Sequence, residues 1–382
     1  MHKINSDNMD RRLSVGSRPI LSSLLTAMAL VGAVALAQAQ SNPLNFSGDF
    51  RVRYERTSKQ EPGGQPDIRD PRNREVVRFR FGLNKKINGL FNFGARIATG
   101  SPDDPNTTDI TIGDFVNDLS ISLDRAYVEF TYHDLFLTGG KFGNPFLTTE
   151  MVWDGDVNLQ GIGASYTFSS SKQITPKFSG VYYIVDEQTN NPDSYMWGGQ
   201  VQLSAKPDAN WGLTLAGAYY DYNIQSLTNA GAGDVLSNNI FGGAYLSDFD
   251  LLDIIAMVDY RGLSPRYPVR LVADFVKNRG AEVDEDAGFG LDLYVGQSSK
   301  KSDLRFQYGY TKTETDAVLA AFSHDNTTLA TNYEQHTLGV DYVVVDDTIL
   351  NLTLYLYRQN QVAPGIENDF FTRIRLNALV KF

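Results

Sequence analysis

The sequence predicts an all-β protein: a transmembrane antiparallel β-barrel of 16 strands, with 18 as the main alternative, preceded by a cleavable signal peptide. Three observations predict this fold. Apolar and polar residues alternate with a period of two in many segments, which is typical of strands with one polar face. Long and short connections take turns, as in barrels with short periplasmic turns and long external loops. Aromatic residues gather at strand ends, where a membrane interface favours them.

The C-terminal stretch 370–382, FFTRIRLNALVKF, shows the alternation most clearly. Its even-numbered residues from Thr372 to Phe382 form a nearly apolar face. The opposite face carries charged and polar residues, with Leu379 as the one exception: Arg373, Arg375, Asn377 and Lys381. A strand that ends on Phe382 gains little in water, but an aromatic ring is well placed at the edge of a hydrocarbon layer. We therefore expect this stretch to be the closing strand of the barrel.

The N-terminus predicts export. Residues 20–36 form the one long apolar run; it follows Arg11, Arg12 and Arg18 and ends at Ala37-Gln38-Ala39, as in a secretory signal peptide. We expect a signal peptide at 1–39, with Met1 or Met9 as the start, and a barrel domain at 40–382. A retained membrane helix is the alternative. The absence of cysteine fits a protein that crosses the oxidising periplasm.

The strands of the N-terminal half follow one another with the same face pattern. In 45–56, the residues Phe46, Phe50, Val52 and Tyr54 oppose charged neighbours, and in 77–83 Val77, Phe79, Phe81 and Leu83 oppose Arg78 and Arg80. After a short turn, 91–97 alternates likewise, and a long acidic segment leads to 125–132. The remaining expected strands of this half are 135–142, 162–168, 177–185, 195–206 and 211–222.

The C-terminal half repeats the scheme. The expected strands are 269–275, 289–295, 304–311, 337–344, 350–357 and 370–382. Between the halves, 240–247 and 251–260 count as two strands or as one. Because both chain ends of an exported barrel lie in the periplasm, the strand number should be even, and merging these two segments, with Asp248 and Asp250 facing the lumen, gives 16. A soluble β fold remains the alternative, but long strands, aromatic ends and charged inner faces favour the membrane barrel.

The chain also resembles a known family. The stretches that carry the resemblance are LDRAYVEFTY (123–132), GGKFGNPFLTTEMVWDGDVNLQGIGASY (139–166), PVRLVADFVKN (268–278) and YGYTKTETDAVLAAFSHDN (308–326), together with the terminal Phe382. They are similar to the putative porin family of Gram-negative outer membranes. This resemblance implies an outer-membrane channel and, by analogy with 16-stranded porins, a homotrimer; it implies no agreed set of functional residues. Phe382 is expected to be recognised by the barrel-assembly machinery.

An arginine cluster is the first candidate site. The first four strands place their arginines on the expected lumen face, where neighbouring strands lie about 4.8 Å apart and could form a positive wall. This arginine wall comprises Arg51, Arg53, Arg78, Arg80, Arg96 and Arg125. The alternative is that the arginines brace the barrel by pairing with Asp49, Glu55 and Glu129. The two roles are compatible.

The second candidate is the 143–160 loop, which follows the fifth strand and carries Glu150, Trp153, Asp154 and Asp156. We expect it to fold into the lumen, where its acidic groups would face the arginine wall and form an eyelet. Trp153 would anchor the loop to the wall. The alternatives are a solvated external loop, a surface turn steadied by Ca²⁺, or a tryptophan that stacks on a sugar.

Other functions are disfavoured by composition. The net charge of −11 argues against nucleic acid as a partner. The four histidines form no triad with serine and aspartate, and no cysteine–histidine metal pattern or phosphate-binding loop occurs. We therefore expect no enzyme, no cofactor and no metal. The sequence predicts a passive diffusion channel for small hydrophilic solutes and ions, in contact with outer-membrane lipid. A solute-selective channel and a non-conducting barrel are the alternatives.

Overall fold

The computed structural model describes residues 43–58, 71–113, 115–169, 173–231, 235–365 and 368–382. By contacts the chain divides into two units, residues 1–44 and 45–382. The predicted signal peptide lies outside the described residues. From Asn45 onward, the barrel belongs to the second unit.

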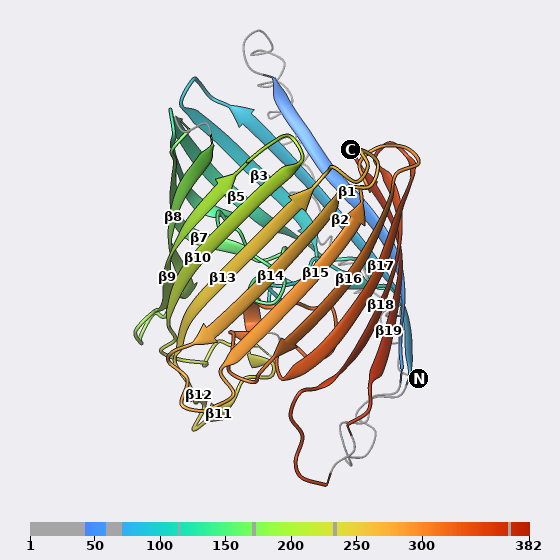
Figure 1. Cartoon of the computed structure of the whole chain (residues 1–382). Helices are drawn as coiled ribbons and strands as arrows, with labels where there is room; N and C mark the ends of the chain where they lie inside the picture. The colour runs from blue at the N-terminus through green and yellow to red at the C-terminus, as the bar shows by residue number, and fades with distance from the viewer. Residues whose placement is uncertain (1–42, 59–70, 114, 170–172, 232–234, 366–367) are drawn as a thin grey trace, which may run out of the picture. The chain divides into compact units, whose positions relative to one another are not determined.

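Sixteen long antiparallel strands form the wall of the barrel (Figure 1). They are β1 Leu44–Thr57, β2 Arg72–Lys86, β3 Phe91–Thr99, β5 Ile121–Tyr132, β6 Leu135–Gly143, β7 Asn158–Thr167, β8 Ile174–Asp186, β9 Ser194–Ala205, β10 Trp211–Asn223, β13 Phe249–Tyr260, β14 Val269–Asn278, β15 Ala287–Gly296, β16 Leu304–Thr313, β17 Tyr333–Val345, β18 Thr348–Gln359 and β19 Phe371–Lys381. The short strand β4 Ile110–Thr111 pairs with β2, and β11 Ile240–Phe241 pairs with β12 Ala244–Tyr245.

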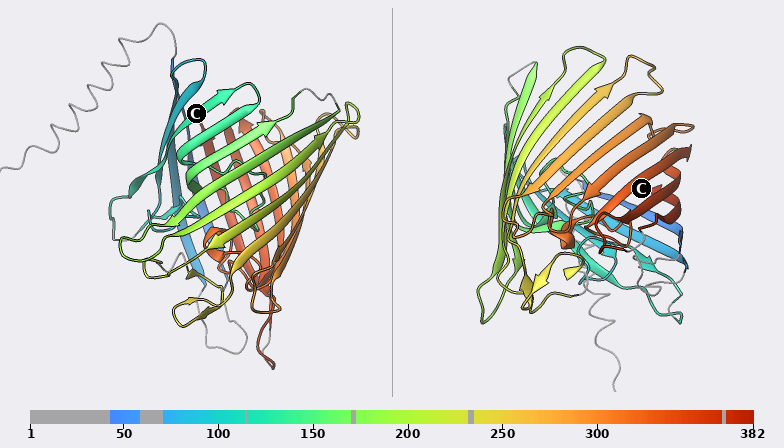
Figure 2. Two further views of the ribbon diagram at one scale, coloured as in Figure 1. Left: turned by 90° about the vertical axis from the view of Figure 1, so that its left-hand side faces the viewer. Right: turned by 60° about the horizontal axis from the view of Figure 1, so that its bottom comes forward.

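Pairing of the first and last strands closes the barrel (Figure 2). The register runs from Asp49 opposite Lys381 to Thr57 opposite Arg373. Phe382 and Gly48 exchange two backbone hydrogen bonds, of 2.8 and 3.1 Å, just beyond this ladder. Closure leaves no unpaired edge strand in the barrel wall that the structure describes. A strand structure needs this in lipid, because the hydrocarbon offers no partner for a backbone amide. The prediction of a closed barrel of 16 strands is therefore confirmed.

The structure reaches the number 16 by a different route from the one the sequence suggested. Residues 240–247 do not continue into the next strand: β13 begins at Phe249, and Ile240–Tyr245 forms a separate two-residue hairpin in the long connection after β10. The merged strand was wrong because Gly242 and Gly243, both at positive φ, turn the chain back on itself between β11 and β12.

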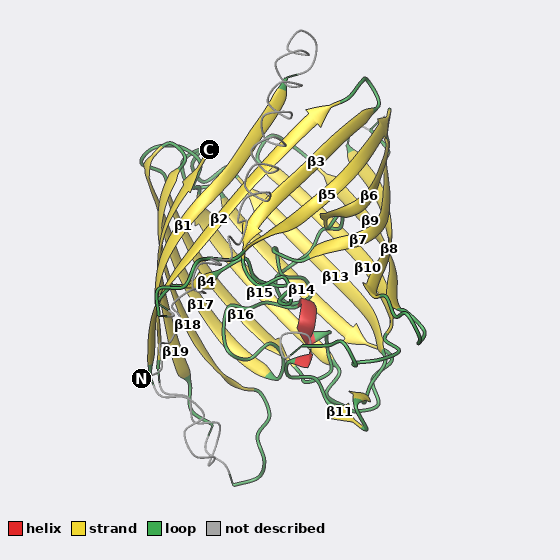
Figure 3. Ribbon diagram, turned by 180° about the vertical axis from the view of Figure 1, so that it is seen from behind, coloured by secondary structure: helices red, strands yellow, loops and turns green. Residues whose placement is uncertain are grey.

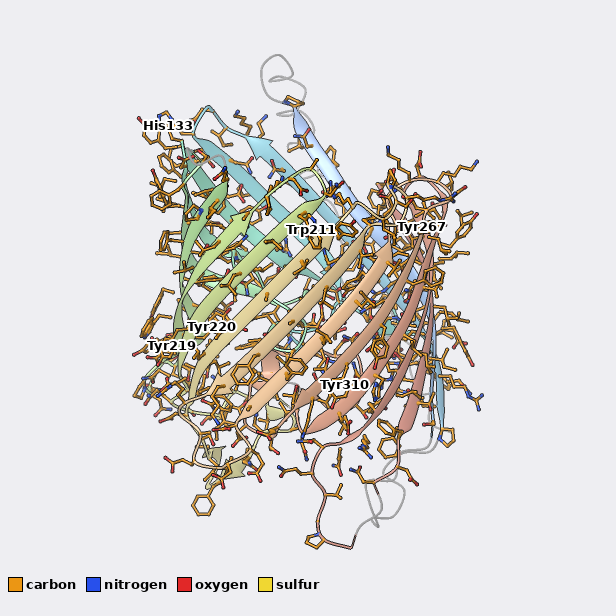
Figure 4. All side chains as sticks on the ribbon, in the orientation of Figure 1. His133, Trp211, Tyr219, Tyr220, Tyr267 and Tyr310 are labelled. Carbon is orange, nitrogen blue, oxygen red and sulfur yellow. The ribbon has the colours of Figure 1, made fainter. Side chains whose placement is uncertain are left out.

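The two faces of each strand differ as the alternation predicts. On β18, Leu350 and Leu352 point outward and are 48% and 46% exposed, whereas Thr353 and Tyr357 are buried on the inner side. Aromatic rings mark the ends of the strands: Trp211 packs on Tyr260 at the short-turn end, with ring centroids 4.5 Å apart (Figure 4). An apolar exterior bordered by aromatic rings is what a lipid bilayer requires.

The C-terminal ring completes this aromatic border at the seam. Phe382 stacks on Phe81, 6.5 Å between centroids, and Phe81 stacks on Phe46 at 5.5 Å. Gly48 permits this contact, because a Cβ atom there would lie 2.7 Å from the Phe382 ring. The terminal ring remains 56% exposed on the outer surface.

Several long connections turn back into the barrel instead of leaving it. Figure 3 shows these connections in green inside the barrel, with the 3-10 helix η1 Ala320–Phe322 in red. All of them start at the end of the barrel that lies opposite the short turns. No helix in the described part of the chain is long and apolar enough to cross a membrane.

Candidate functional site

The 143–160 loop lies against the inner surface of the barrel. Leu147 exchanges two hydrogen bonds with the Gln200 amide of β9, of 2.8 and 2.7 Å, and the Thr149 hydroxyl donates to the Asp274 carboxylate of β14. The ammonium group of Lys177 on β8 donates to the Pro145 carbonyl at 2.9 Å. These contacts carry the loop across the lumen from β6 to the far wall.

Trp153 forms the aromatic centre of this loop. Its ring is 2% exposed, lies 5.7 Å from Tyr220 of β10 in an edge contact, and stacks on Phe322 at 5.6 Å. Tyr222 packs at its side. Buried in this way, the ring anchors the loop and has no free face on which a sugar could stack.

A second inward segment, residues 314–332, was not foreseen from the sequence. The side chain of Asn238 holds it: the amide nitrogen donates to the carbonyls of Thr315 and Val318, and the amide oxygen accepts from Ala320 N–H. The segment is apolar and buried from Ala317 to Phe322. An apolar run, DAVLAAF, inside a long polar connection is the signal that could have revealed it.

The inward segments bind one another. The Asp154 N–H of the 143–160 loop donates to the Phe322 carbonyl at 2.8 Å, and the Asn106 amide donates to the Ser323 carbonyl at 3.0 Å. The Thr108 hydroxyl donates to Asp156 at 2.9 Å. A layer built from three connections, 100–112, 143–160 and 314–332, therefore crosses the lumen.

The arginine wall lies on the lumen side of β1, β2, β3 and β5, and carboxylates of the inward segments meet it. Asp109 pairs with Arg51 and Arg53, and Asp156 pairs with Arg80 at 2.7 Å. Asp49 on β1 bridges Arg78 and Arg80, at 2.9 and 2.7 Å. Burial disfavours the charged form of Asp109, but Arg53 and Arg51 outweigh it and hold the pKa of that carboxyl below its usual range.

The remaining two arginines of the wall have other partners. Arg96 pairs with Asp124, which stands at a register shift between β3 and β5, and Arg125 donates to the Asn158 amide oxygen at 2.5 Å. The Asn158 amide in turn donates to Asp124. Alternation alone could not reveal Asp124, because the bulge takes it out of the two-residue rhythm.

Among the ion pairs of the described residues, none joins Glu55 or Glu129 to the arginine wall. Glu129 accepts a hydrogen bond from Asn92 at 2.7 Å. Glu55 is 2% exposed and binds a different set of arginines: Arg74 at 2.7 Å, Arg375 at 2.7 Å and Arg373 at 3.6 Å. This cluster joins β1, β2 and β19 across the closing seam of the barrel.

Glu150 and Asp154 lie on the 143–160 loop in different surroundings. Glu150 is exposed to the lumen, whereas Asp154 is buried and accepts the Asp156 N–H at 2.7 Å. Burial raises the pKa of Asp154 well above its usual range, and the negative charges of Glu150 and Asp325 raise it further. We infer that Asp154 is protonated at neutral pH, so that it adds no charge to the lumen.

Replacing Asp154 with asparagine tests this assignment. The raised pKa means that wild-type protein loses stability as the pH rises above about 4, by up to about 1.4 kcal/mol per pH unit, because only the unfolded chain releases the proton freely. Asp154→Asn keeps the acceptor and has no proton to lose. Its free energy of unfolding in detergent should therefore exceed that of wild type increasingly from pH 5 to pH 9. If the free energy of unfolding depended on pH in the same way for both proteins, the assignment of a protonated Asp154 would be contradicted.

The wall opposite the arginines is acidic. On the lumen side of β13 to β17 stand five buried or half-buried aspartates against two arginines, Arg270 and Arg305; the aspartates are Asp253, Asp259, Asp274, Asp292 and Asp341. Positive and negative side chains thus face each other across the layer of inward segments. Charges arranged in this way create a field transverse to the lumen.

Two cavities flank the layer. The larger, about 1100 Å³, extends from the short-turn end to Glu150, Trp153 and Gly155. The smaller, about 750 Å³, is lined from the long-connection side and reaches Asp156 and Asn158. The 143–160 loop therefore lies between two aqueous chambers. Within the described residues, no group of three or more His, Asp and Glu is placed to hold a metal ion.

A closed antiparallel barrel with an apolar exterior and a charged, hollow interior defines the class of outer-membrane channels. The family described as "Putative porin" matches residues 37–237, which is more than half of the chain, and the protein belongs to this family. It is an outer-membrane porin, a water-filled diffusion channel in contact with lipid and with the solutes that cross it. Both family and fold are those of a channel rather than an enzyme.

Solved structures agree on the fold. The barrel is similar to Pseudomonas putida OprB, with 12% identity, coverage of 89% of this chain and 94% of that chain, and a TM-score of 0.60. The barrel is also similar to an anion-selective porin from Comamonas acidovorans, with 12% identity, coverage of 90% of this chain and 100% of that chain, and a TM-score of 0.55. A third similar structure is Salmonella typhi OmpF in complex with daunomycin. Its identity is 12%, the match covers 89% of this chain and 98% of that chain, and the TM-score is 0.54. A comparison with curated proteins gives no match.

Proposed function

We propose that the channel is constricted by the 143–160 loop and that the arginine wall and the acidic wall act on the solutes that pass this point. The observation that carries the proposal is the position of the loop between the two cavities, with Arg80 bound to Asp156 on one side and Thr149 bound to Asp274 on the other. A solute that is narrower than the opening beside the 143–160 loop crosses the channel down its concentration gradient. The transverse field orients solutes that carry a dipole.

The balance of charge at the arginine wall decides which ions the constriction favours. Six arginines face four carboxylates, namely Asp49, Asp109, Asp124 and Asp156, so positive charge prevails on this side. The side chains of Arg51 and Arg80 are 17% and 19% accessible, more than those of Arg53 and Arg78 on the same two strands. We propose that these two arginines offset the acidity of the rest of the lumen and hold back cations.

Reversal potentials in a salt gradient test this role. In planar bilayers, the Arg51→Gln, Arg80→Gln double variant should show a K⁺ over Cl⁻ permeability ratio severalfold above that of wild type, because the wall loses two positive charges. Arg270→Gln is the control: it removes one positive charge from the opposite wall, outside the constriction, and should change the ratio much less. An unchanged ratio in the double variant would show that the arginines only brace the barrel.

We also propose that Phe382 is recognised by the barrel-assembly machinery and that the protein assembles as a homotrimer. The exposed terminal ring supports the first part, since a signal at the end of the last strand must be accessible. The second part rests on analogy with barrels of 16 strands. In cells, Phe382→Ala should lower the amount of barrel in the outer membrane, and cross-linking in the native membrane tests the trimer.

A further inference from the structure

The outward surface at the long-connection end of β16, β17 and β18 carries charged groups that border an apolar part of the exterior. Lys312, Glu334 and Arg358 lie directly opposite one another on the three strands and form a row. The next outward row toward the middle of the barrel is Tyr310, His336 and Leu356. Figure 4 shows Tyr310 on this outer side of β16. Because external loops are the long ones in such barrels, these rows face the outer leaflet.

Contacts within the two rows hold the charged groups in place. The Arg358 guanidinium donates twice to Glu334, at 2.9 and 2.6 Å, and lies 4.5 Å from the centroid of the Phe370 ring. The Tyr310 hydroxyl donates to the other Glu334 oxygen at 3.3 Å. Lys312 is exposed, and within the described residues it has no ion-pair partner. A lysine and an arginine therefore stand beside a single carboxylate.

An apolar groove of about 530 Å³ begins where this polar surface ends. Tyr308 belongs to both: its hydroxyl is hydrogen-bonded to His336 Nδ1 at 3.0 Å, and its ring lines the groove. The groove continues toward the middle of the barrel between Leu338, Leu354 and Ile374. Polar and apolar surfaces thus meet in the order in which a membrane lipid presents its headgroup and its acyl chains.

We propose that this surface, comprising Lys312, Arg358 and the groove below them, binds a lipid of the outer leaflet whose headgroup carries phosphate. A phosphate group accepts hydrogen bonds from a guanidinium and an ammonium group at once, and the excess of positive charge in the row is complementary to it. An acyl chain fills the groove, which faces hydrocarbon. The site lies on the outer face of the barrel and is independent of the constriction and of ion selectivity.

Native mass spectrometry of the detergent-solubilised protein tests the proposal with two probes, a phosphatidic acid and the diacylglycerol of the same chain length. Wild type should retain the phosphatidic acid and not the diacylglycerol. Lys312→Gln with Arg358→Gln should weaken retention roughly 30-fold, since each basic residue near an anionic headgroup contributes about a factor of five. Val340→Phe, which fills the groove and leaves the charges intact, should weaken it as well.

The matched control is Arg56→Gln, which removes an exposed, outward cation from β1 near the same end of the barrel. It should retain the lipid like wild type. All variants should keep wild-type conductance, which verifies folding because none of these side chains faces the lumen. Equal retention of both probes, equal loss in Arg56→Gln, or displacement of the lipid by inorganic phosphate alone would overturn the proposal. So would a double variant that changes the oligomeric mass, because the surface would then be a subunit interface.

Discussion

Glu55→Ala should lower the free energy of unfolding of the barrel by about 3–5 kcal/mol. The carboxylate of Glu55 is the shared partner of Arg74, Arg373 and Arg375, and the side chains of Arg373 and Arg375 are almost completely buried. Removing it leaves two buried guanidinium groups next to each other without their counter-charge. The measurement is denaturant unfolding in detergent, followed by the heat-dependent mobility shift of folded barrels in gels.

An exposed ion pair provides the comparison. Asp259 and Arg270 are in contact at 2.7 Å, but both side chains are substantially exposed, so Asp259→Asn should change stability by less than about 1 kcal/mol. If Glu55→Ala also lowers the free energy of unfolding by less than about 1 kcal/mol, the other acceptors of Arg375 are sufficient. These acceptors are the Asn326 amide oxygen and the Asp325 carbonyl. The seam would then not depend on Glu55.

Trp153→Ala should increase single-channel conductance and its fluctuations more than any other single substitution in the lumen. The ring packs on Phe322, Tyr220 and Tyr222, and deleting a buried aromatic side chain of this size costs about 3–5 kcal/mol. A loop that loses this anchor samples undocked states, and the two cavities then merge. Conductance in planar bilayers is the readout.

Trp197 offers a control of the same chemistry. It lies on β9 but points outward and is 48% exposed, so Trp197→Ala should leave conductance unchanged. If Trp153→Ala also conducts like wild type, the 143–160 loop is not the narrowest part of the channel. The 314–332 segment would then be the next candidate, and Asn238→Ala, which removes three of its hydrogen bonds, would test it.

The wall of the barrel could be predicted from the sequence because its pattern is local. A lipid-facing residue and its lumen-facing neighbour differ in polarity at most steps, as in Leu352 and Thr353, so most faces follow from the sequence without knowledge of the partners. The strand count was less secure, because the hairpin at 240–245 has strand-like residues and lies outside the main sheet. Local propensity does not distinguish it from a strand of the wall.

The interior could be predicted only in part, because it depends on contacts between distant segments. Arg80 was a candidate from its face on β2, but its partner Asp156 lies 76 positions away on the chain. Asp109 and the 314–332 segment have no periodic pattern that marks them as inward. Their docking depends on the Asn238 side chain and on Asn106, which look like ordinary loop residues in the sequence.

Cysteine labelling tests the central claim, that one face of each strand lines water and the other meets lipid. The natural chain has no cysteine, so Gln307→Cys and Phe306→Cys each introduce a single thiol on adjacent residues of β16. Gln307 lines the larger cavity, and Phe306 is exposed on the outside. In liposomes, a charged, membrane-impermeant thiol reagent should label the Gln307→Cys protein and spare the Phe306→Cys protein. Labelling of the second and protection of the first would contradict the barrel described above.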